Sequence, residues 1–318
     1  MDAGQGNQNG WRRAMWAMVP DGNGSVTLTE VAEPTCAADE VLIAVEAYSL
    51  NRGETFLLDS PPSGWRPGKD VAGVIVATGA AVTGLRVGGR VVAHPEHSGW
   101  AHLTAVNADR VAALPDTVPS AVAAALPLAG LTALRLLRAV GALPGRSVLI
   151  TGASGGVGHY FVELAAGLGA RITALCSSAG RGRRLIELGA ERVITNLDEA
   201  RGPYDIVVES VGGDLFPAAW RLLSDRGLFV WMGQASRTPP TIDFFDWTGG
   251  ANAQLRKFLY SDSDISDGDD LATLVRLVAT GRLHPEIGLL TDWTNTGEAI
   301  AELLARRIRG NAVLEVTR

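Results

Sequence analysis

The sequence predicts an α/β protein in which a β-rich region is followed by a doubly wound parallel sheet. Val-rich apolar runs, broken by Gly, Pro or Asp, fill residues 15–114. From Ser147 onward strand-like and helix-like segments alternate, and the strands are continuous apolar runs. Such runs are expected where helices cover both faces of a parallel sheet. A glycine-rich turn directly follows the first of these strands.

Composition narrows the class of protein. Of 318 residues, 47% are hydrophobic and 19% charged, so every region has enough apolar residues for a packed core. The net charge of −6 argues against a nucleic-acid or anionic-membrane surface. Two cysteines are too few for a disulfide framework or a four-thiolate zinc site. Residues 1–10 are polar and no apolar run reaches the ~20 residues of a membrane span, so we expect a cytoplasmic protein.

The β-rich region is expected to form a compact, mostly antiparallel domain. Its strands are expected at VLIAVEAYSL (41–50), VAGVIVATG (71–79) and GGRVVAH (88–94). The character of the sequence changes at Pro115. Residues 119–140 are rich in Ala and Leu at helical spacing and predict a helix.

The second region predicts alternating strands and helices. The strands are expected at SVLITGA (147–153), ARITALCS (170–177), ERVITN (191–196), YDIVVESVG (204–212) and GLFVWMG (227–233), and the helices at 156–168, 180–188 and 271–280. The remaining tail, ending in NAVLEVTR, is too short to form a domain. We expect it to return to the β-rich region.

The glycine-rich turn is the strongest motif in the chain. It reads TGASGGVG over residues 151–158, between an apolar strand and a predicted helix. Its spacing is that of a dinucleotide-binding fingerprint, in which glycines let the backbone approach a pyrophosphate at a helix N-terminus. The alternative is a tight turn without a ligand. The residues expected to bind the cofactor here are Gly152, Ser154, Gly155, Gly156, Val157 and Gly158.

The end of the next strand indicates which dinucleotide binds. An NAD site places Asp or Glu there for the ribose 2′-hydroxyl, about 20 residues after the glycines. Here residues 174–181 read ALCSSAGR, without a carboxylate. Hydroxyls followed by arginine suit a 2′-phosphate, so the sequence favours NADP(H). We expect Ser177, Ser178, Arg181 and Arg184 to bind it; the alternative is that the arginines form a solvated helix face.

Three segments together resemble the medium-chain dehydrogenase/reductase superfamily, and within it the zinc-free quinone oxidoreductases of the zeta-crystallin group. They are KDVAGVIVATGAAVTGLRVGGRVVA, GASGGVG and GRLHPEIGLLTDW with EAIAELLARRIRGNAVLEV. The likeness runs from about Met15 to the C-terminus. It implies a GroES-like catalytic domain over residues 1–117 with 264–318 returning to it, a Rossmann domain over 118–263, a site in the cleft between them, and a homodimer.

The zinc ligands of the superfamily are missing. Zinc-dependent members carry a Cys followed some twenty residues later by Gly-His-Glu. Here these positions are Asn51 and Gly68-Lys69-Asp70. Neither Asn nor Lys is a useful zinc ligand. His94 and His97 lie close in sequence, but only Glu96 accompanies them, so we expect no metal.

The resemblance also implies roles for single residues. The family motif Asn-x-x-(Asp/Glu)-x-Tyr, which lines the nicotinamide and substrate, reads here from Asn51 to Phe56. Phe lacks the hydroxyl, so only packing against the substrate is expected of it. Thr132 would contact the cofactor near the nicotinamide, or bond a helix carbonyl instead. Gly233 would approach the nicotinamide ribose, and Asn311, where the family often has Lys, would hold the cofactor or cap a turn.

The implied activity is hydride transfer from NADPH to a quinone or an α,β-unsaturated carbonyl, a small-molecule substrate. One alternative is a dedicated enoyl or alkenal reductase of a biosynthetic pathway, because Leu50-Asn51-Arg52 also resembles enoyl-reductase modules. Another is an NADPH-binding protein with little turnover. Two loops, 57–66 and 238–250, carry aromatic side chains that either shape the substrate pocket or simply pack. These aromatic residues are Trp65, Phe244, Phe245 and Trp247.

Overall fold

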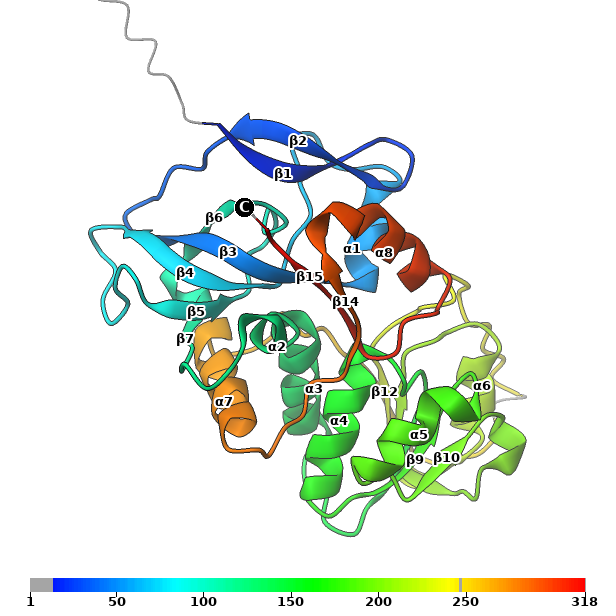
Figure 1. Cartoon of the computed structure of the whole chain (residues 1–318). Helices are drawn as coiled ribbons and strands as arrows, with labels where there is room; N and C mark the ends of the chain where they lie inside the picture. The colour runs from blue at the N-terminus through cyan, green and yellow to red at the C-terminus, as the bar shows by residue number, and fades with distance from the viewer. Residues whose placement is uncertain (1–13, 246–247, 318) are drawn as a thin grey trace, which may run out of the picture.

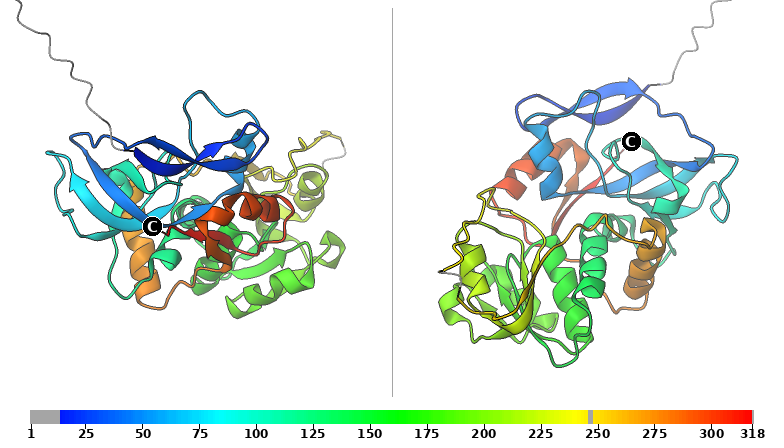
Figure 2. Two further views of the ribbon diagram at one scale, coloured as in Figure 1. Left: turned by 45° about the horizontal axis from the view of Figure 1, so that its top comes forward. Right: turned by 180° about the vertical axis from the view of Figure 1, so that it is seen from behind.

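The computed structural model describes residues 14–245 and 248–317. The polar segment 1–10 therefore lies outside the described residues. A β-rich part lies above a second sheet flanked by helices, and the C-terminus returns to the β-rich part (Figure 1). Residues 258–266, which connect the second sheet to helix α7 (Asp267–Ala279), pass between the two parts, as the view from behind shows (Figure 2).

The β-rich part contains a hairpin and a seven-stranded sheet. The hairpin pairs β1 (Ala14–Pro20) with β2 (Val26–Ala32). The sheet has the order β14-β15-β3-β4-β5-β7, with β6 also on β3, and every pair in it is antiparallel except β14 with β15. Its strands are β3 (Glu40–Leu50), β4 (Val71–Thr78), β5 (Arg90–Ala93), β6 (Leu103–Asn107), β7 (Val111–Ala113), β14 (Ile287–Asp292) and β15 (Asn311–Glu315).

The second sheet is doubly wound, as the sequence predicts. Its six parallel strands have the order β10-β9-β8-β11-β12-β13, so the direction of winding reverses between β8 and β11. The strands are β8 (Ser147–Ile150), β9 (Arg171–Leu175), β10 (Arg192–Ile194), β11 (Tyr204–Glu209), β12 (Leu223–Trp231) and β13 (Gln254–Lys257). Helices α4 (Gly156–Gly167), α5 (Ala179–Glu187) and α6 (Leu215–Trp220) connect them. The predicted α/β class, a GroES-like part with a Rossmann sheet, is confirmed.

Several helices differ from the sequence prediction in their bounds. Residues 119–140 form two helices, α2 (Ser120–Ala124) and α3 (Pro127–Val140). Pro127 begins the second helix, because proline favours the first position of a helix, where its missing N–H costs nothing. Helix α7 (Asp267–Ala279) begins earlier than expected, since the Ser266 side chain accepts the Asp269 N–H. Helices α1 (Arg52–Leu58) and α8 (Thr296–Leu304), and strand β13, complete the fold.

A buried ion-pair network fixes α7 against α3. Arg135 of α3 is 6% exposed. Its guanidinium donates to Asp270 at 2.8 Å and to Asp267 at 2.8 Å, and also to the backbone carbonyl of Tyr260 at 2.9 Å. Asp270 itself is fully buried. One arginine thereby holds both the helix and the segment that leads into it.

Replacing Arg135 by Ala should destabilise the protein by about 3 kcal/mol, because it removes one of the two arginines that pair with the buried Asp270 carboxylate; Arg138, at 2.6 Å, remains and keeps the loss at the lower end for a buried ion pair. Urea unfolding followed by circular dichroism measures this loss. The matched control is Arg307→Ala, which removes a solvent-screened pair with Glu302 and should shift the urea midpoint far less. Equal urea midpoints for the two variants would show that the network does not hold α7.

Candidate active site

A single buried carboxylate joins the elements around the site. Asp70, just before β4, is fully buried. Its Oδ2 accepts hydrogen bonds from Ser49 Oγ and Asn51 Nδ2, both at 2.7 Å, and its Oδ1 accepts the Leu128 N–H at 2.8 Å. Ser49 lies near the end of β3, Asn51 precedes α1, and Leu128 lies in the first turn of α3. Asp70 therefore sets the orientation of Asn51 and links Asn51 to the N-terminal turn of α3.

A second buried acid lies beside Asn51. Glu54 in the first turn of α1 is 2% exposed. It accepts the Gly68 N–H at 2.8 Å, and its other oxygen lies 3.2 Å from Asn51 Nδ2. Burial, reinforced by the charge of Asp70, raises the pKa of Glu54 to about 8. At neutral pH this carboxyl group is mostly protonated.

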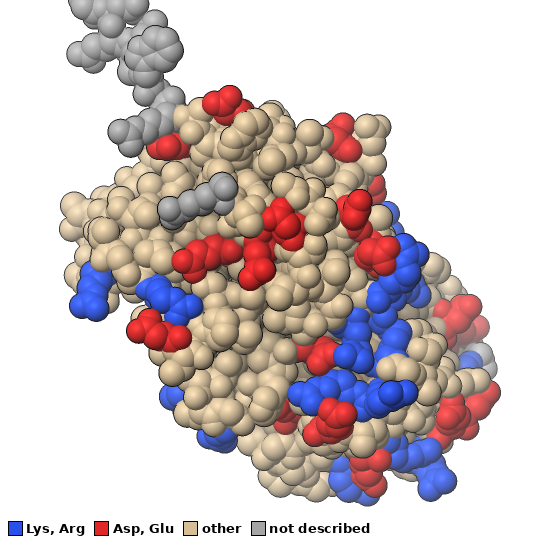
Figure 3. Space-filling view, in the orientation of Figure 1, with Lys and Arg blue, Asp and Glu red and all other residues tan. Residues whose placement is uncertain are grey.

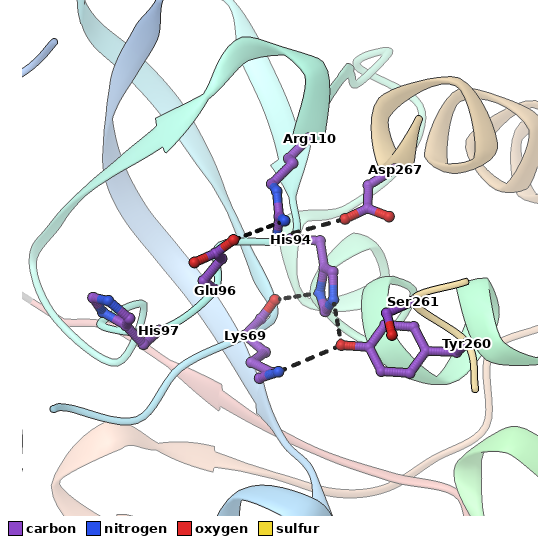
Figure 4. A pocket seen from close by; sticks show the side chains of 8 residues that line it. All are labelled: Lys69, His94, Glu96, His97, Arg110, Tyr260, Ser261 and Asp267. Atoms are coloured by element: carbon purple, nitrogen blue, oxygen red, sulfur yellow. Dashed lines mark hydrogen bonds and ion pairs between the residues drawn. The ribbon is translucent and has the colours of Figure 1, made fainter. Parts of the chain in front are cut away.

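Three polar side chains meet at a pocket next to this network (Figure 4). The pocket has a volume of about 490 Å³. The Lys69 Nζ lies 3.4 Å from the Tyr260 hydroxyl, and His94 Nε2 lies 3.3 Å from the same oxygen. His94 Nδ1 lies 2.7 Å from the Lys69 carbonyl and 3.4 Å from Asp70 Oδ1. Asp70 therefore borders both Asn51 and this pocket.

The glycine-rich turn lies where the winding of the second sheet reverses. It connects β8 to α4, and Gly152 has φ +62°, a conformation that favours glycine. A Cβ on Gly158 would lie 2.2 Å from the Ala153 carbonyl oxygen, so helix and strand approach too closely for a side chain. Ligands of doubly wound sheets bind at this switch point. The turn has the geometry that its sequence predicts.

Arg181 lies against this turn. Its Nε donates to Ser154 Oγ at 3.1 Å, and its two Nη atoms donate to the carbonyls of Arg306 at 2.7 Å and Ile308 at 2.6 Å. The guanidinium thus connects α5, the glycine-rich turn and the segment before β15. Three of its five N–H bonds are used in this way.

The other residues expected near a 2′-phosphate lie around Arg181. Ser177 and Ser178 are exposed between β9 and α5. Arg184 pairs with Glu187 and with Glu286. Basic side chains gather on the face where α5 and the segment after α8 lie, interspersed with acidic ones (Figure 3).

Three further cofactor candidates have partners within the protein. Thr132 Oγ donates to the Leu128 carbonyl at 2.6 Å, the helix bond that the sequence left as an alternative. Asn311 Nδ2 lies 3.1 Å from the Glu286 carbonyl oxygen, and Asn311 Oδ1 abuts Gly156, where a Cβ would lie only 2.5 Å away. Gly233, which follows β12, packs against the backbone of Ser210, and a Cβ on Gly233 would lie 3.2 Å from the Ser210 carbonyl oxygen. Val157 is half-buried in the first turn of α4.

Phe56 lies where α1 meets the loop after β12. The Arg237 guanidinium stacks over the Phe56 ring at 4.3 Å and lies 3.4 Å from Asp59 Oδ2. The aromatic residues of the 238–250 loop are different: Phe244 and Phe245 are 82% and 93% exposed and touch each other edge to face. Trp247 lies outside the described residues. Trp65 packs against the core of the β-rich part.

The residues at the zinc positions do not fit zinc. The Asn51 amide donates to Asp70, and the Lys69 ammonium donates to Tyr260. Within residues 14–245 and 248–317, no three His, Cys, Asp or Glu side chains are grouped as metal ligands. In the same residues no helix has the length and hydropathy needed to cross a bilayer.

Sequence reasoning did not find Tyr260 or Arg237. Tyr260 follows the short strand β13 and meets Lys69 across 191 positions of sequence. Arg237 meets Phe56 in the same way, from a loop with no motif of its own. No local pattern marks either residue, because each acquires its position from the packing of the two parts.

Comparison with known proteins gives matches along most of the chain. Residues 37–117 match the alcohol dehydrogenase GroES-like domain family, and residues 184–314 match the zinc-binding dehydrogenase family. The chloroplast envelope quinone oxidoreductase homolog of Arabidopsis thaliana is 30% identical over 90% of this chain and 92% of its own length. The 2-methylene-furan-3-one reductase of Solanum lycopersicum is 34% identical over 74% of this chain and 66% of its own length.

One relative is much longer than this chain. Polyketide synthase GfsB of Streptomyces halstedii is 33% identical over 95% of this chain, which spans only 6% of that synthase. Among solved structures, mycobacterial Rv1454c complexed with NADPH superposes with a TM-score of 0.85 at 25% identity, covering 95% of this chain and all of the other.

Replacing Glu54 by Gln should flatten the pH dependence of stability. The pKa of Glu54 rises from 4.5 in the unfolded chain to about 8 in the folded protein, so between these values the folded state binds more protons. The free energy of unfolding then falls as pH rises from 5 to 8, by at most ~1.4 kcal/mol per pH unit. Gln cannot ionise, so its variant loses this slope.

Urea midpoints measured at intervals from pH 5 to 8 test this. The control is Glu302→Gln, an acid whose side chain is 41% exposed, and it should keep the slope of the unmodified protein. Parallel profiles for the Glu54→Gln variant and the unmodified protein would contradict the raised pKa.

Proposed function

Since this chain belongs to the quinone oxidoreductase family of medium-chain dehydrogenases/reductases, we propose that it reduces a quinone or an α,β-unsaturated carbonyl with NADPH. The observation that carries the proposal is the placement of the glycine-rich turn at the switch point of the second sheet. The Asn311 side chain packs against Gly156 of this turn. The NADPH complex of a structurally similar protein supports the choice of cofactor.

The residues present fit a dinucleotide. Gly155, the N-cap of α4, has no close contact where a side chain would lie, so a pyrophosphate could approach the backbone there, and the N-terminus of α4 favours its charge. Gly152 supplies the positive φ of the turn, and Gly156 and Gly158 pack closely against Asn311 and Ala153. Ser154 and Val157 belong to the same turn. Thr132, Gly233 and Asn311 would face the nicotinamide half. When bound, NADPH supplies the hydride.

NADPH rather than NADH is proposed because no carboxylate follows β9. Ser177 and Ser178 are exposed there, with Arg181 and Arg184 on the helix that follows. Arg181 retains two N–H bonds beyond those that bind the protein, and these would donate to a 2′-phosphate. Its bonds to Arg306 and Ile308 would hold the guanidinium in place.

The protein's own contribution to the reaction is orientation, hydrogen bonding and exclusion of water. Asn51, fixed by Asp70, would contact the nicotinamide and the acceptor, and Phe56 would pack against the acceptor. A dedicated enoyl reductase of a biosynthetic pathway is the second candidate. It is favoured by the likeness of 95% of this chain to part of a polyketide synthase.

We also propose the domain boundaries and the assembly. A catalytic domain of residues 1–117 and 264–318 agrees with the pairing of β15 with β3, and 118–263 would be the cofactor domain. A homodimer through the edge strand β13 is supported by the exposure of all four of its residues. Two free cysteines suit the reducing cytoplasm.

NADPH should bind at least tenfold more tightly than NADH, and Arg181→Ala should remove most of that difference. A charge-assisted hydrogen bond of about 1.5–3 kcal/mol accounts for a factor of this size. Titration of each cofactor, followed by its fluorescence, measures the ratio. The control is Arg183→Ala, an exposed arginine of the same helix, which should leave the ratio unchanged. Equal binding of both cofactors to the unmodified protein would refute the assignment.

Protein treated with a chelator should oxidise NADPH when given quinones or enones, at the rate of untreated protein, because the described residues include no ligand set that suits zinc. A spectrophotometric assay against a panel of each class tests this and separates the two candidates. If NADPH binds tightly but neither panel accelerates its oxidation, the protein is a binding protein with little turnover. Activity that returns only with added zinc would contradict the metal-free proposal.

A further inference from the structure

We infer that Lys69 and Tyr260 form the anion-stabilising and proton-donating site of this reductase, where the carbonyl oxygen of the acceptor binds. The inference rests on the proposed function and adds the two residues that would act on the acceptor's oxygen. They meet His94 at the pocket of about 490 Å³ beside Asp70 (Figure 4). A pocket of this size suits a quinone or a small enone.

The hydrogen-bond polarity at the pocket follows from the donors and acceptors. The Lys69 carbonyl can only accept, so His94 Nδ1, at 2.7 Å, carries the proton in the neutral ring. His94 Nε2 is then the acceptor for the Tyr260 hydroxyl at 3.3 Å. The Lys69 ammonium has no acceptor capacity and donates to the same phenol oxygen at 3.4 Å. His94 thus orients the phenol, and Lys69 polarises it.

The charges around the pocket leave Lys69 as the group that attracts an anion. Arg110, the other strong cation of the lining, pairs with Glu96 at 2.9 Å and lies 3.8 Å from Asp267. No ion pair joins Lys69 to a carboxylate in the described parts of the chain, and its ammonium points at Tyr260. Burial raises the pKa of the Tyr260 phenol, so the hydroxyl keeps its proton at neutral pH.

The position of Tyr260 is fixed from the other side. Its carbonyl accepts from Arg135, the buried arginine that binds α7. Lys69 is the residue before Asp70, whose carboxylate accepts the hydrogen bond of Asn51, so Asp70 connects the pocket to Asn51. In this proposal Tyr260 takes, from a different element, the role of the hydroxyl that Phe56 lacks.

The proposed step is balanced as follows. Hydride addition from NADPH to the acceptor moves an electron pair onto the carbonyl oxygen, giving an enolate or a hydroquinone anion. The Tyr260 hydroxyl turns from His94 Nε2 toward the bound acceptor, and the acceptor oxygen takes its proton, forming an enol or a hydroquinone. The enol becomes the saturated carbonyl in water. The Tyr260 phenolate takes a proton from the Lys69 ammonium, and the Lys69 amine regains one from solvent. The sum is acceptor, NADPH and one proton giving reduced acceptor and NADP⁺.

Binding of 4-nitrophenolate to the protein without cofactor tests the anion site directly. This aromatic oxyanion imitates the charged oxygen, and its absorbance reports binding. We expect Tyr260→Phe and Lys69→Met each to weaken its binding at least tenfold, while neutral nitrobenzene binds all three proteins alike. His284→Ala, at a half-exposed side chain that pairs with Glu163 and does not line the pocket, is the matched control and should bind as the unmodified protein does. Circular dichroism checks that each variant is folded.

The second readout separates the proton donor from the cofactor site. Tyr260→Phe should lower kcat for enones at least tenfold while the Kd for NADPH stays the same. If the unmodified protein reduces enones but this variant keeps the same nitrophenolate binding and the same kcat, the role of Tyr260 is overturned and the proposed function still stands. If the unmodified protein reduces no acceptor, the proposed function fails and the proton-donor role fails with it, whatever nitrophenolate does.

Discussion

The carboxylate of Asp70 is the interaction on which the arrangement of the site depends. It is fully buried, and its bonds to Ser49, Asn51 and the Leu128 N–H join β3, α1 and α3. A buried charge is tolerated only where donors surround it, so these segments must keep their places for the carboxylate to remain satisfied. The Asp70 carboxylate also lies 3.4 Å from His94 Nδ1, and Lys69 is the residue that precedes Asp70 in the chain. One carboxylate therefore orients both the nicotinamide side and the acceptor side of the proposed site.

The C-terminal segment performs the corresponding task at the glycine-rich turn. β15 pairs with β3 in the β-rich sheet, and just before it the Gly310 N–H donates to the Ser154 carbonyl at 3.0 Å. Arg181 adds two bonds to carbonyls of the same segment. The chain end thus links the sheet that carries Asn51 to the turn proposed to hold the pyrophosphate. Hydride transfer needs such a fixed relation, since small displacements of the reacting atoms cost large factors in rate.

Local sequence determined the features that were predictable. The succession of strands and helices along the chain and the turn at 151–158 each depend on residues that are neighbours in sequence, and the residues at the zinc positions, Asn51 and Lys69, follow from the family resemblance. Tyr260 and Arg237 could not be predicted, because their partners lie across the boundary between the two parts. The exposure of Phe244 and Phe245 could not be predicted from sequence either, since an aromatic loop has the same composition whether it lines a pocket or faces water.

Hydride transfer from NADPH to a conjugated carbonyl without a metal is tested most directly by reducing a cyclic enone with NADPH deuterated on the transferred C4 position. The protein is freed of metal by chelation, and the label is located by NMR. Direct transfer places deuterium on the β-carbon of the saturated product. A product without deuterium, or one that forms only after zinc is restored, would contradict it.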